Sequence, residues 1–444
     1  MAFSAVSRPL FRSRLASSRC LASSSRSISH PAPITSSRRH YSAAAASEEL
    51  KKTPLYDFHL ANQGKLVPFA GYHLPIQYGS LSHKESHHFT RTNASLFDVS
   101  HMVQHIFKGP DAAAFLETVT PSDWRGQGSL QSKLTTFLWR ETGGIVDDSV
   151  ITRLGEQEYY VVTNGACLEK DLKYFDEELG KFGGSVEWTT LDNSGLLALQ
   201  GPRSAEVLQE VIAPSSAVDL SKLYFGNAIW AKLKLSGGEE SHPVLISRGG
   251  YTGEDGFELS FNGKAYPAFE STPLATQHLL QNAGPERLQL AGLAARDSLR
   301  LEAGMCLYGH DLDDTTTPVE AGLSWIIPKE RRASGGFHGA EVINAQLTPK
   351  SKGGRGVDRR RVGFVINGAP AREGAEIHKD GEKVGTVTSG LPSPTVGKNI
   401  AMGYVKDGLH KAGTEVDVVV RGKKRSATVT KMPFTPAKYY KGDA

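Results

Sequence analysis

Apolar and polar residues alternate along the C-terminal part of the chain, from Arg361 on, which is the pattern of β-strands. The runs RVGFVI, KVGTVTSG, NIAMGYV, TEVDVVVR and SATVTK follow one another beyond Arg361. Asp380-Gly381 lies between two such runs and suits a tight hairpin turn. The preceding segment KSKGGRGVDRR, between Lys350 and Arg361, is glycine-rich and basic without apolar periodicity, and it predicts a linker. A small β barrel or sandwich is therefore expected at the C-terminal end.

Strand and helix patterns mix in the longer region 53–349. YYVVTNG and GLLALQG are apolar runs that stop at glycine, as strands do, and TPLYDFHL predicts a capped helix from Thr53. The stretch from Glu286 to Gly304 has apolar residues at helical spacing and predicts a helix that a glycine ends. The pattern as a whole predicts an α+β protein.

Charge is distributed unevenly along the chain. The first 47 residues contain seven arginines, no lysine and no acid, with many serines and alanines, which is the composition of a mitochondrial transit peptide. We predict this peptide over residues 1–41. The rest of the chain carries 44 Lys and Arg against 47 Asp and Glu, so a general affinity for nucleic acid loses its support.

Two other classes of protein find no support in the sequence. Apolar runs fall short of the roughly 18–20 residues of a membrane helix. Cys20, Cys167 and Cys306 form no CxxC pair, so neither a zinc site nor a disulfide framework is indicated. We therefore expect a soluble protein of a reducing compartment.

The stretch RGGYTGEDGFELS, Arg248 to Ser260, combines four glycines with three acids. It lacks both the GK[ST] of a phosphate loop and the alternating oxygen ligands of a calcium loop. Alternation in FELSF predicts a half-buried strand with Glu258 on its polar face. Glu258 then either meets solvent or lines a cavity that the glycines allow a ligand to approach.

Acids and bases at two further places are candidates for chemistry. In GGIVDDSV, Asp147 and Asp148 interrupt a β-branched strand, and adjacent strand residues face opposite ways, so at most one should line a site. Arg296 and Arg300 share one helix face, and Arg300 is expected to form structural salt bridges with Asp297 or Glu302. The histidines of HKESHHF lack the spacing of a zinc motif, so we predict no metal site.

Several long segments, taken in order, closely resemble the aminomethyltransferase (T-protein) family of the glycine cleavage system. They include LYDFHLANQGKLVPFAGYHLPIQY, SLFDVSHM, GGIVDDSVIT, GYTGEDGFE, LAARDSLRLEAGMCLYGHDLDDTTTPVEAGLSW and KMPFTPAKYY. The resemblance implies a three-domain folate-binding fold around a central cavity. Residues 53–349 would form two intertwined α+β domains, and residues 361–440 a C-terminal β barrel.

The resemblance also implies a reaction and a set of site residues. The family passes a one-carbon unit from an aminomethyl group on the lipoyl arm of H-protein to tetrahydrofolate, without a metal. This gives 5,10-methylenetetrahydrofolate, ammonia and the reduced lipoyl arm. A carboxylate in a water-poor cavity would stabilise the cation that forms when the S–CH2–NH2 unit breaks. By this resemblance Asp147 is the catalytic acid, and the expected folate-binding residues are Glu258, Arg296, Tyr251 and Tyr439, whereas Glu254 and Asp255 are expected to be structural acids.

Partner and compartment follow from the same resemblance. The family acts with H-protein in the mitochondrial matrix, and the basic clusters Arg359–Arg361 and Lys329–Arg332 are either solvated surface or a docking site for it. One alternative function is a non-enzymatic folate-binding protein of the iron–sulfur assembly type. Those proteins carry a KGCYxGQE-type motif, whereas the corresponding segment here reads RLEAGMCLYGHDLDD. A folate domain of a flavin-dependent dehydrogenase would need a dinucleotide-binding domain, for which this chain has no room.

Overall fold

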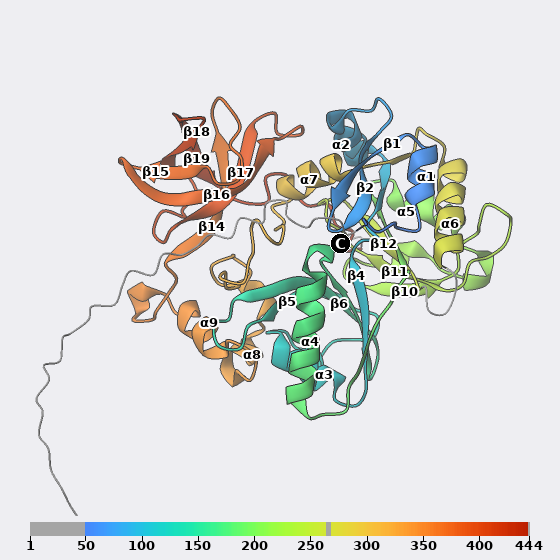
Figure 1. Cartoon of the computed structure of the whole chain (residues 1–444), viewed down its shortest axis with the longest axis horizontal. Coiled ribbons are helices and arrows are strands. Elements are labelled where there is room, and N and C mark those ends of the chain that lie inside the picture. The colour runs from blue at the N-terminus through green and yellow to red at the C-terminus, as the bar shows by residue number, and fades with distance from the viewer. Residues whose placement is uncertain (1–48, 263–267, 443–444) are drawn as a thin grey trace, which may run out of the picture. The chain divides into compact units, whose positions relative to one another are not determined.

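Helices, three sheets and a closed barrel make up residues 49–262 and 268–442, the part of the chain that a computed structural model describes (Figure 1). The α+β class predicted from the sequence is thus confirmed. The predicted transit peptide, residues 1–41, lies outside the described residues. None of the described helices is both long and apolar enough to cross a membrane.

A six-stranded sheet carries Glu258 and, in the loop between two of its strands, Tyr251. Its strand order is β10-β11-β12-β9-β3-β13, and only the pairing of β13 with β3 is parallel. Helices α5 and α6 pack on the face that carries Leu197, Phe257 and Leu259. The strands and helices are β3 (Ala94–Asp98), β9 (Gly195–Gln200), β10 (Ala228–Ala231), β11 (Val244–Arg248), β12 (Gly256–Phe261), β13 (Leu288–Leu290), α5 (Ser204–Val211) and α6 (Ala268–Ala283).

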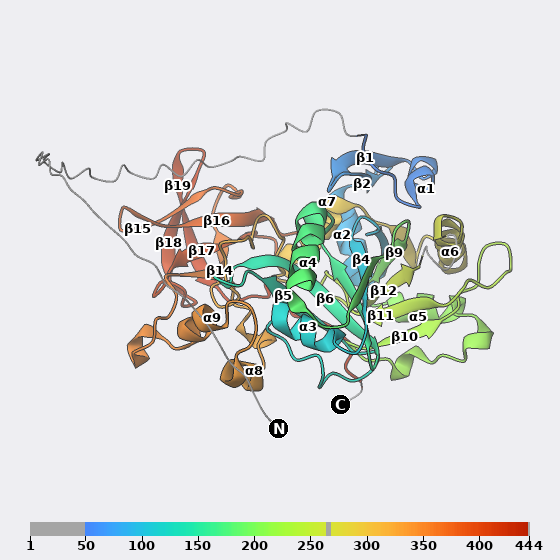
Figure 2. The same ribbon diagram turned by 60° about the horizontal axis from the view of Figure 1, so that its bottom comes forward.

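A second, five-stranded sheet of order β5-β6-β7-β4-β8 carries Asp147 and Asp148. The chain enters it after β3 and returns to the six-stranded sheet at β9, so the two sheets are interleaved in sequence. Aromatic residues under α3 and α4 fill one face, and α4 lies across β5 and β6 in both views (Figures 1 and 2). The elements are β4 (Val103–Lys108), β5 (Ser132–Leu138), β6 (Ile145–Gly155), β7 (Glu158–Thr163), β8 (Glu187–Thr190), α3 (Ala112–Val119) and α4 (Leu168–Phe182).

A third apolar cluster joins the inner faces of these two sheets. It contains Phe97 and Ala198 from the six-stranded sheet, and Tyr160 and Val162 from the five-stranded sheet. Ala295 and Leu299 of α7 (Leu293–Glu302) close it at one end. The inner faces therefore meet around α7, and the candidate residues lie on the elements that border this layer.

The N-terminal segment packs against α7. A two-stranded sheet of β1 (Gly64–Phe69) and β2 (Tyr72–Tyr78) follows α1 (Tyr56–Ala61). Helix α2 (His83–Thr92) begins with a capping box, because the Ser82 hydroxyl accepts from the Glu85 N–H and the Glu85 carboxylate accepts from the Ser82 N–H at 2.9 Å. This local signal fixes where α2 begins.

The prediction of a helix from Glu286 to Gly304 is wrong for the first third of that segment. Residues 288–290 form strand β13, and the helix proper, α7, begins at Leu293. Gly292 separates the two, and a Cβ atom there would lie 2.4 Å from the carbonyl oxygen of Ile76. Pairing of Leu288 with Ala94 overrides the local helical pattern, which is a tertiary effect that spacing alone does not reveal.

Six antiparallel strands close into the predicted C-terminal barrel, in the order β14-β17-β16-β15-β18-β19. The first strand begins at Arg359, so the end of the segment predicted as a linker is already sheet. Short helices α8 (Lys329–Ser334) and α9 (Ala340–Leu347) precede the barrel. The strands are β14 (Arg359–Ile366), β15 (Glu376–Lys379), β16 (Glu382–Pro392), β17 (Asn399–Lys406), β18 (Glu415–Val420) and β19 (Lys423–Thr430).

A buried ionic network around Glu302 ties the barrel to the rest of the chain. The Glu302 carboxylate accepts from Arg91 at 2.8 Å and from the Thr395 N–H, in the loop after β16, at 3.0 Å. His87 lies 3.1 Å from it, and Ser393 donates to it. Burial alone raises the pKa of Glu302, but the hydrogen bonds and charge of His87 and the other donors outweigh it and lower the pKa to about 2.

Replacing Glu302 with glutamine is expected to lower the free energy of unfolding by about 3–5 kcal/mol, the cost of breaking a buried ion pair. The loss should shrink in acid. A depressed pKa contributes stability that is present above the unfolded value of about 4.3 and is lost as the pH falls through about 2. Urea unfolding between pH 3 and pH 8 measures this. Glu382→Gln, on an exposed strand end, is the control, and an equal loss in both variants would contradict the assignment.

Candidate active site

The glycine-rich loop between β11 and β12 needs its glycines for close approach. A Cβ atom on Gly256 would lie 2.6 Å from the carbonyl oxygen of Leu199 on the neighbouring strand, and Gly253 has a φ of +77°. The acids of the loop are structural, as predicted. Glu254 pairs with Arg91 at 3.0 Å, and Asp255 pairs with Arg248 at 2.5 Å.

Strand β12 is buried on both faces, so the prediction of a half-buried strand is wrong. Phe257 and Leu259 pack into the outer core, while Ser260 is only 5% exposed and donates to Gln104 of β4 at 2.5 Å. The polar face of β12 therefore faces the other sheet instead of solvent. Glu258 lies on this face and is partly exposed.

Glu258, Arg296 and Tyr251 come together at this inner layer. The Arg296 guanidinium lies 4.7 Å from the ring centroid of Tyr251, and its charge acts on Glu258 without a direct ion pair between them. The Tyr251 hydroxyl donates to the carbonyl oxygen of Cys306. Burial raises the pKa of Glu258 and lowers the pKa of Arg296. The structure thus brings together three of the four residues predicted to bind folate.

Two buried nitrogens beside this group have no hydrogen-bond partner among the described residues. They are Nη1 of Arg296 and Nδ1 of His101. His101 follows β3, contacts the Phe69 ring edge-on at 5.4 Å, and burial together with the Arg296 charge lowers its pKa to about 4. A neutral imidazole and a guanidinium edge are therefore free to meet a ligand. Sequence reasoning missed His101 because nothing in SLFDVSHM distinguishes it from a core histidine.

Tyr439 approaches the same loop from the C-terminal tail. Its ring stacks on Phe225 at 4.2 Å, and the neighbouring Lys438 N–H donates to the carbonyl oxygen of Gly253 at 2.8 Å. The Lys438 ammonium also pairs with Glu254 at 3.1 Å. The tail is thereby fixed against the glycine-rich loop that carries Tyr251.

Asp147 and Asp148 lie nearer each other than strand alternation predicts. Asn164, at the end of β7, donates its side-chain amide to Asp147 at 2.8 Å and to Asp148 at 3.0 Å, and its backbone N–H to Asp147 at 2.8 Å. The register between β5 and β6 shifts here and leaves Val146 without a partner, which is a β-bulge. Both carboxylates nevertheless reach the same side-chain amide, that of Asn164.

The two acids have different surroundings. Asp147 is fully buried, whereas Asp148 is partly exposed and its charge acts on Tyr251 and Cys306. Burial, and then the charge of Asp147, raise the pKa of Asp148 to about 7. Burial also raises the pKa of Asp147, against the hydrogen bonds from Asn164. Asp148 is thus the acid of the pair on the side of Tyr251.

One histidine of HKESHHF, His87, has partners for both of its ring nitrogens within the chain. His87 is buried, with Nδ1 2.7 Å from the Ser298 hydroxyl and Nε2 3.1 Å from Glu302. Both ring nitrogens are therefore used within the chain. Arg300 is likewise paired, with Asp297 at 2.9 Å as predicted and with Asp311 at 2.7 Å.

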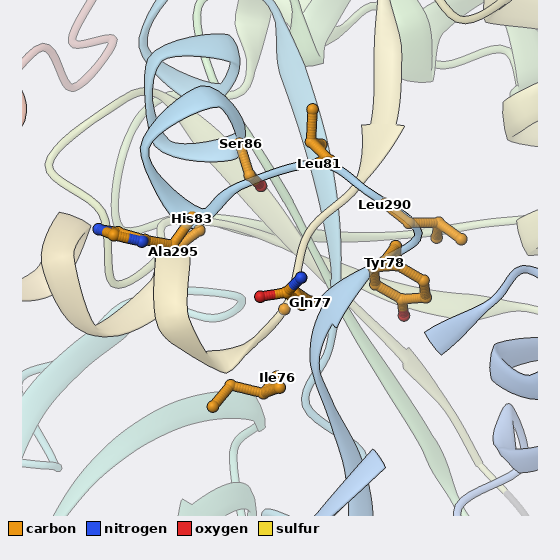
Figure 3. Close-up of a pocket in the computed structure, with 9 residues that line it drawn as sticks. Ile76, Gln77, Tyr78, Leu81, His83, Ser86, Leu290 and Ala295 are labelled. Carbon is orange, nitrogen blue, oxygen red and sulfur yellow. The ribbon is translucent and has the colours of Figure 1, made fainter. Parts of the chain in front are cut away.

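Figure 3 shows a small hollow lined by residues of β2, the start of α2 and the β13–α7 segment. Gln77, Tyr78 and His83 are among its lining residues, which include no acid and no arginine. The lining therefore lacks the charged groups expected for a folate site.

The basic clusters considered for docking make contacts within the chain. Arg359 pairs with Glu320 at 3.3 Å and Arg360 with Asp407 at 2.5 Å. Arg361 donates to the carbonyl oxygen of Gly304 at 3.0 Å. Arg331 and Arg332 also donate to backbone carbonyl groups. Contacts within the chain thus engage these guanidinium groups, and a role of either cluster in docking stays a prediction.

Comparison with known proteins gives matches over nearly all of the described chain. Residues 55–331 match the GCVT N-terminal domain family, and residues 359–435 match the glycine cleavage T-protein C-terminal barrel domain. The mitochondrial aminomethyltransferase of Pisum sativum is 48% identical over 401 residues, covering 89% of this chain and 92% of that protein. That of Homo sapiens is 48% identical over 402 residues, covering 89% and 93%.

A solved structure agrees with these matches. The glycine cleavage system aminomethyltransferase T of Bartonella henselae superposes with a TM-score of 0.77 at 35% identity, covering 88% of this chain and all of that one. Together with the closed barrel and the acid-containing site, the matches define an enzyme of the aminomethyltransferase class. The chain belongs to the glycine cleavage T-protein family. The alternative of a non-enzymatic iron–sulfur assembly protein is not favoured, because these relatives are named as aminomethyltransferases.

Proposed function

We propose that this chain transfers the one-carbon unit of an aminomethyl group, carried on the lipoyl arm of H-protein, to tetrahydrofolate. The products are 5,10-methylenetetrahydrofolate, ammonia and dihydrolipoyl H-protein. Family membership supports the tetrahydrofolate-dependent transfer and a place in the glycine cleavage system. The identification of H-protein as the donor and of the mitochondrial matrix as the compartment belongs to the proposal, and relatives named as mitochondrial support the latter.

The observation that carries the site assignment is the unpaired polar group formed by Glu258 and Arg296. The partly exposed carboxylate of Glu258 has no side-chain partner among the described residues, and Nη1 of Arg296 is buried without a partner, so a ligand that bonds to both would stabilise the site. The pterin ring has neighbouring N–H donors and a carbonyl acceptor on one edge, which suits both groups. We assign Glu258 and Arg296 to the pterin, with Tyr251 as a wall of the site and Tyr439 as a further contact.

We propose that Asp148 is the acid that contacts the reacting groups, and that Asp147 helps to hold Asp148 in place. Tetrahydrofolate supplies the amine nitrogens that accept the one-carbon unit. A carboxylate beside them stabilises developing positive charge and accepts a proton. Asp148 is partly exposed on the side of Tyr251, and its raised pKa suits proton transfer near neutral pH. The resemblance instead implies Asp147 as the catalytic acid, and that assignment stays a prediction. Variants of the two residues distinguish the two assignments.

A single turnover tests the proposal. Full-length chain, tetrahydrofolate and aminomethyl-loaded H-protein are mixed, and 5,10-methylenetetrahydrofolate is followed. The expected result is product formation that requires all three components. Tetrahydrofolate binding without product would instead support a binding protein, and absence of folate binding would overturn the assignment of Glu258 and Arg296.

A further inference from the structure

Asp171 is a buried acid that the reaction does not account for. It lies in the first turn of α4, is 1% exposed, and shares the buried stripe of that helix with Tyr174, Phe175 and Glu178. No N–H or O–H group of the described residues meets either of its oxygens with good hydrogen-bond geometry. What its carboxyl group contacts is the carboxyl group of Asp147.

Two carboxyl groups in contact inside the protein must share a proton. Both cannot be ionised without a nearby cation, because like charges in a poorly solvated site repel strongly. The cation that acts on this cluster is Lys170, but its ammonium group pairs with Asp314 at 3.2 Å and with the Tyr308 hydroxyl. At least one of the two carboxyl groups therefore keeps a proton.

The hydrogen bonds decide which of the two keeps it. Asp147 accepts two bonds at 2.8 Å from Asn164, and such bonds favour the ionised form. The Thr163 side chain acts as a donor on Asp171, but its effect is smaller than those of burial and of Asp147, and it makes no hydrogen bond of good geometry. Burial, and then the charge of Asp147, raise the pKa of Asp171 to about 10. The proton accordingly belongs on Asp171, whose O–H can donate to Asp147.

We propose that Asp171 is a positioning residue that donates a hydrogen bond to Asp147 and thereby holds Asp147, Asn164 and Asp148 in the arrangement that presents Asp148 to the substrates. This inference rests on the proposed function for its consequence in the reaction. The chain of contacts is continuous, since one amide, that of Asn164, bonds to both acids of β6. Asp171 itself touches no substrate.

Other groups that face this cluster are accounted for. Thr163 at the end of β7 lies close, and its hydroxyl is 3.2 Å from His105 of β4, a histidine that burial keeps neutral by lowering its pKa to about 3. The remaining titratable neighbours are Cys167, Tyr174, Tyr308 and Lys170. Burial raises the pKa of the thiol and of the two tyrosine hydroxyls, so these groups are neutral near pH 7, and Lys170 is paired with Asp314.

Thermal unfolding of Asp171→Asn across pH tests where the proton lies. A carboxyl whose folded pKa is raised loses stability as the pH rises from the unfolded value of about 3.9 toward the folded one. Asparagine keeps an N–H donor and has no such loss. We expect equal melting temperatures for variant and wild type near pH 3 and a relative gain for the variant that grows up to pH 8. A loss for the variant at neutral pH would show that Asp171 is ionised, and would overturn the proposal.

Turnover distinguishes positioning from bulk packing. Asp171→Asn should keep kcat close to the wild type, because its amide replaces the donor. Asp171→Leu, which is similar in size but has no donor, should lose roughly tenfold in kcat, the cost of one lost hydrogen bond to a charged group. KM for tetrahydrofolate should stay unchanged in both. Equal kcat in the asparagine and leucine variants would contradict the proposal.

Failure of this inference is distinguishable from failure of the proposed function. The unfolding experiment needs neither tetrahydrofolate nor H-protein, so it locates the proton even if the full-length chain shows no transfer. Infrared difference spectra give a second readout. The carbonyl stretch of a protonated carboxyl group should be present in the wild type between the pKa of Asp148, about 7, and that of Asp171, about 10, and lost in Asp171→Asn; its persistence in the variant at that pH would overturn the assignment.

Discussion

Replacing Asp148 with asparagine is expected to lower the rate of one-carbon transfer by about 10²–10³-fold, the usual cost of removing a group that stabilises developing charge. Tetrahydrofolate should still bind, because Glu258, Arg296 and Tyr251 are unchanged. The side chain keeps its size and can still meet Asn164, so the fold should be retained. Single-turnover kinetics together with a folate titration measure both quantities.

Asp147→Asn is the matched control for this prediction. Asparagine at 147 faces two N–H donors of Asn164 with only one accepting oxygen, so we expect a smaller loss that arises from misplacing Asp148. A greater loss in Asp147→Asn than in Asp148→Asn would instead support Asp147 as the catalytic acid, as the sequence resemblance implies.

The pH dependence separates the two acids further. If ionised Asp148 is the acting form, the rate should rise with pH and level off above about 7. Burial is the main cause of that raised pKa, and the charge of Asp147 adds to it. The rising limb should therefore move to lower pH in Asp147→Asn. If the rate rises over the same pH range in Asp147→Asn as in the wild type, the Asp147 charge does not act on the titrating group.

The sequence predicted the barrel because its signal is local, since alternation over six to eight residues fixes a strand wherever the chain lies. The arginine that pairs with Glu254 is Arg91, which is distant in the sequence, so this ion pair could not be predicted from local spacing. The helix from Glu286 failed where a distant strand, β3, offered Leu288 a better pairing. Local spacing carries no information about such a partner.

The arrangement of the acids depended on features that no spacing rule contains. The amide that bonds to both Asp147 and Asp148 comes from Asn164, directly after a different strand, β7. Asp171 did leave a trace in the sequence, because an acid on the apolar stripe of LEKDLKYF is costly to bury without a partner. Its partner Asp147 lies on a different element, so only the folded chain shows the pair.

Glu258→Gln is expected to weaken tetrahydrofolate binding about 10- to 100-fold, the cost of losing hydrogen bonds to a charged group. The reason is that a carboxylate accepts both N–H donors of the pterin edge, whereas an amide accepts one and opposes the other. Isothermal titration of tetrahydrofolate into the variant measures the loss. Glu187→Gln, on the exposed edge strand β8, is the control and should bind as the wild type does.

The stability of the same variant shows whether Glu258 serves binding or the fold. Burial raises the pKa of Glu258, and no described side chain pairs with its carboxylate, so its charge destabilises the free protein. Glutamine removes that charge, and the melting temperature without ligand should stay the same or rise. The stabilisation by saturating tetrahydrofolate should shrink in parallel with the affinity. A variant that melts lower without ligand and binds normally would show that Glu258 is a structural residue and that the pterin lies elsewhere.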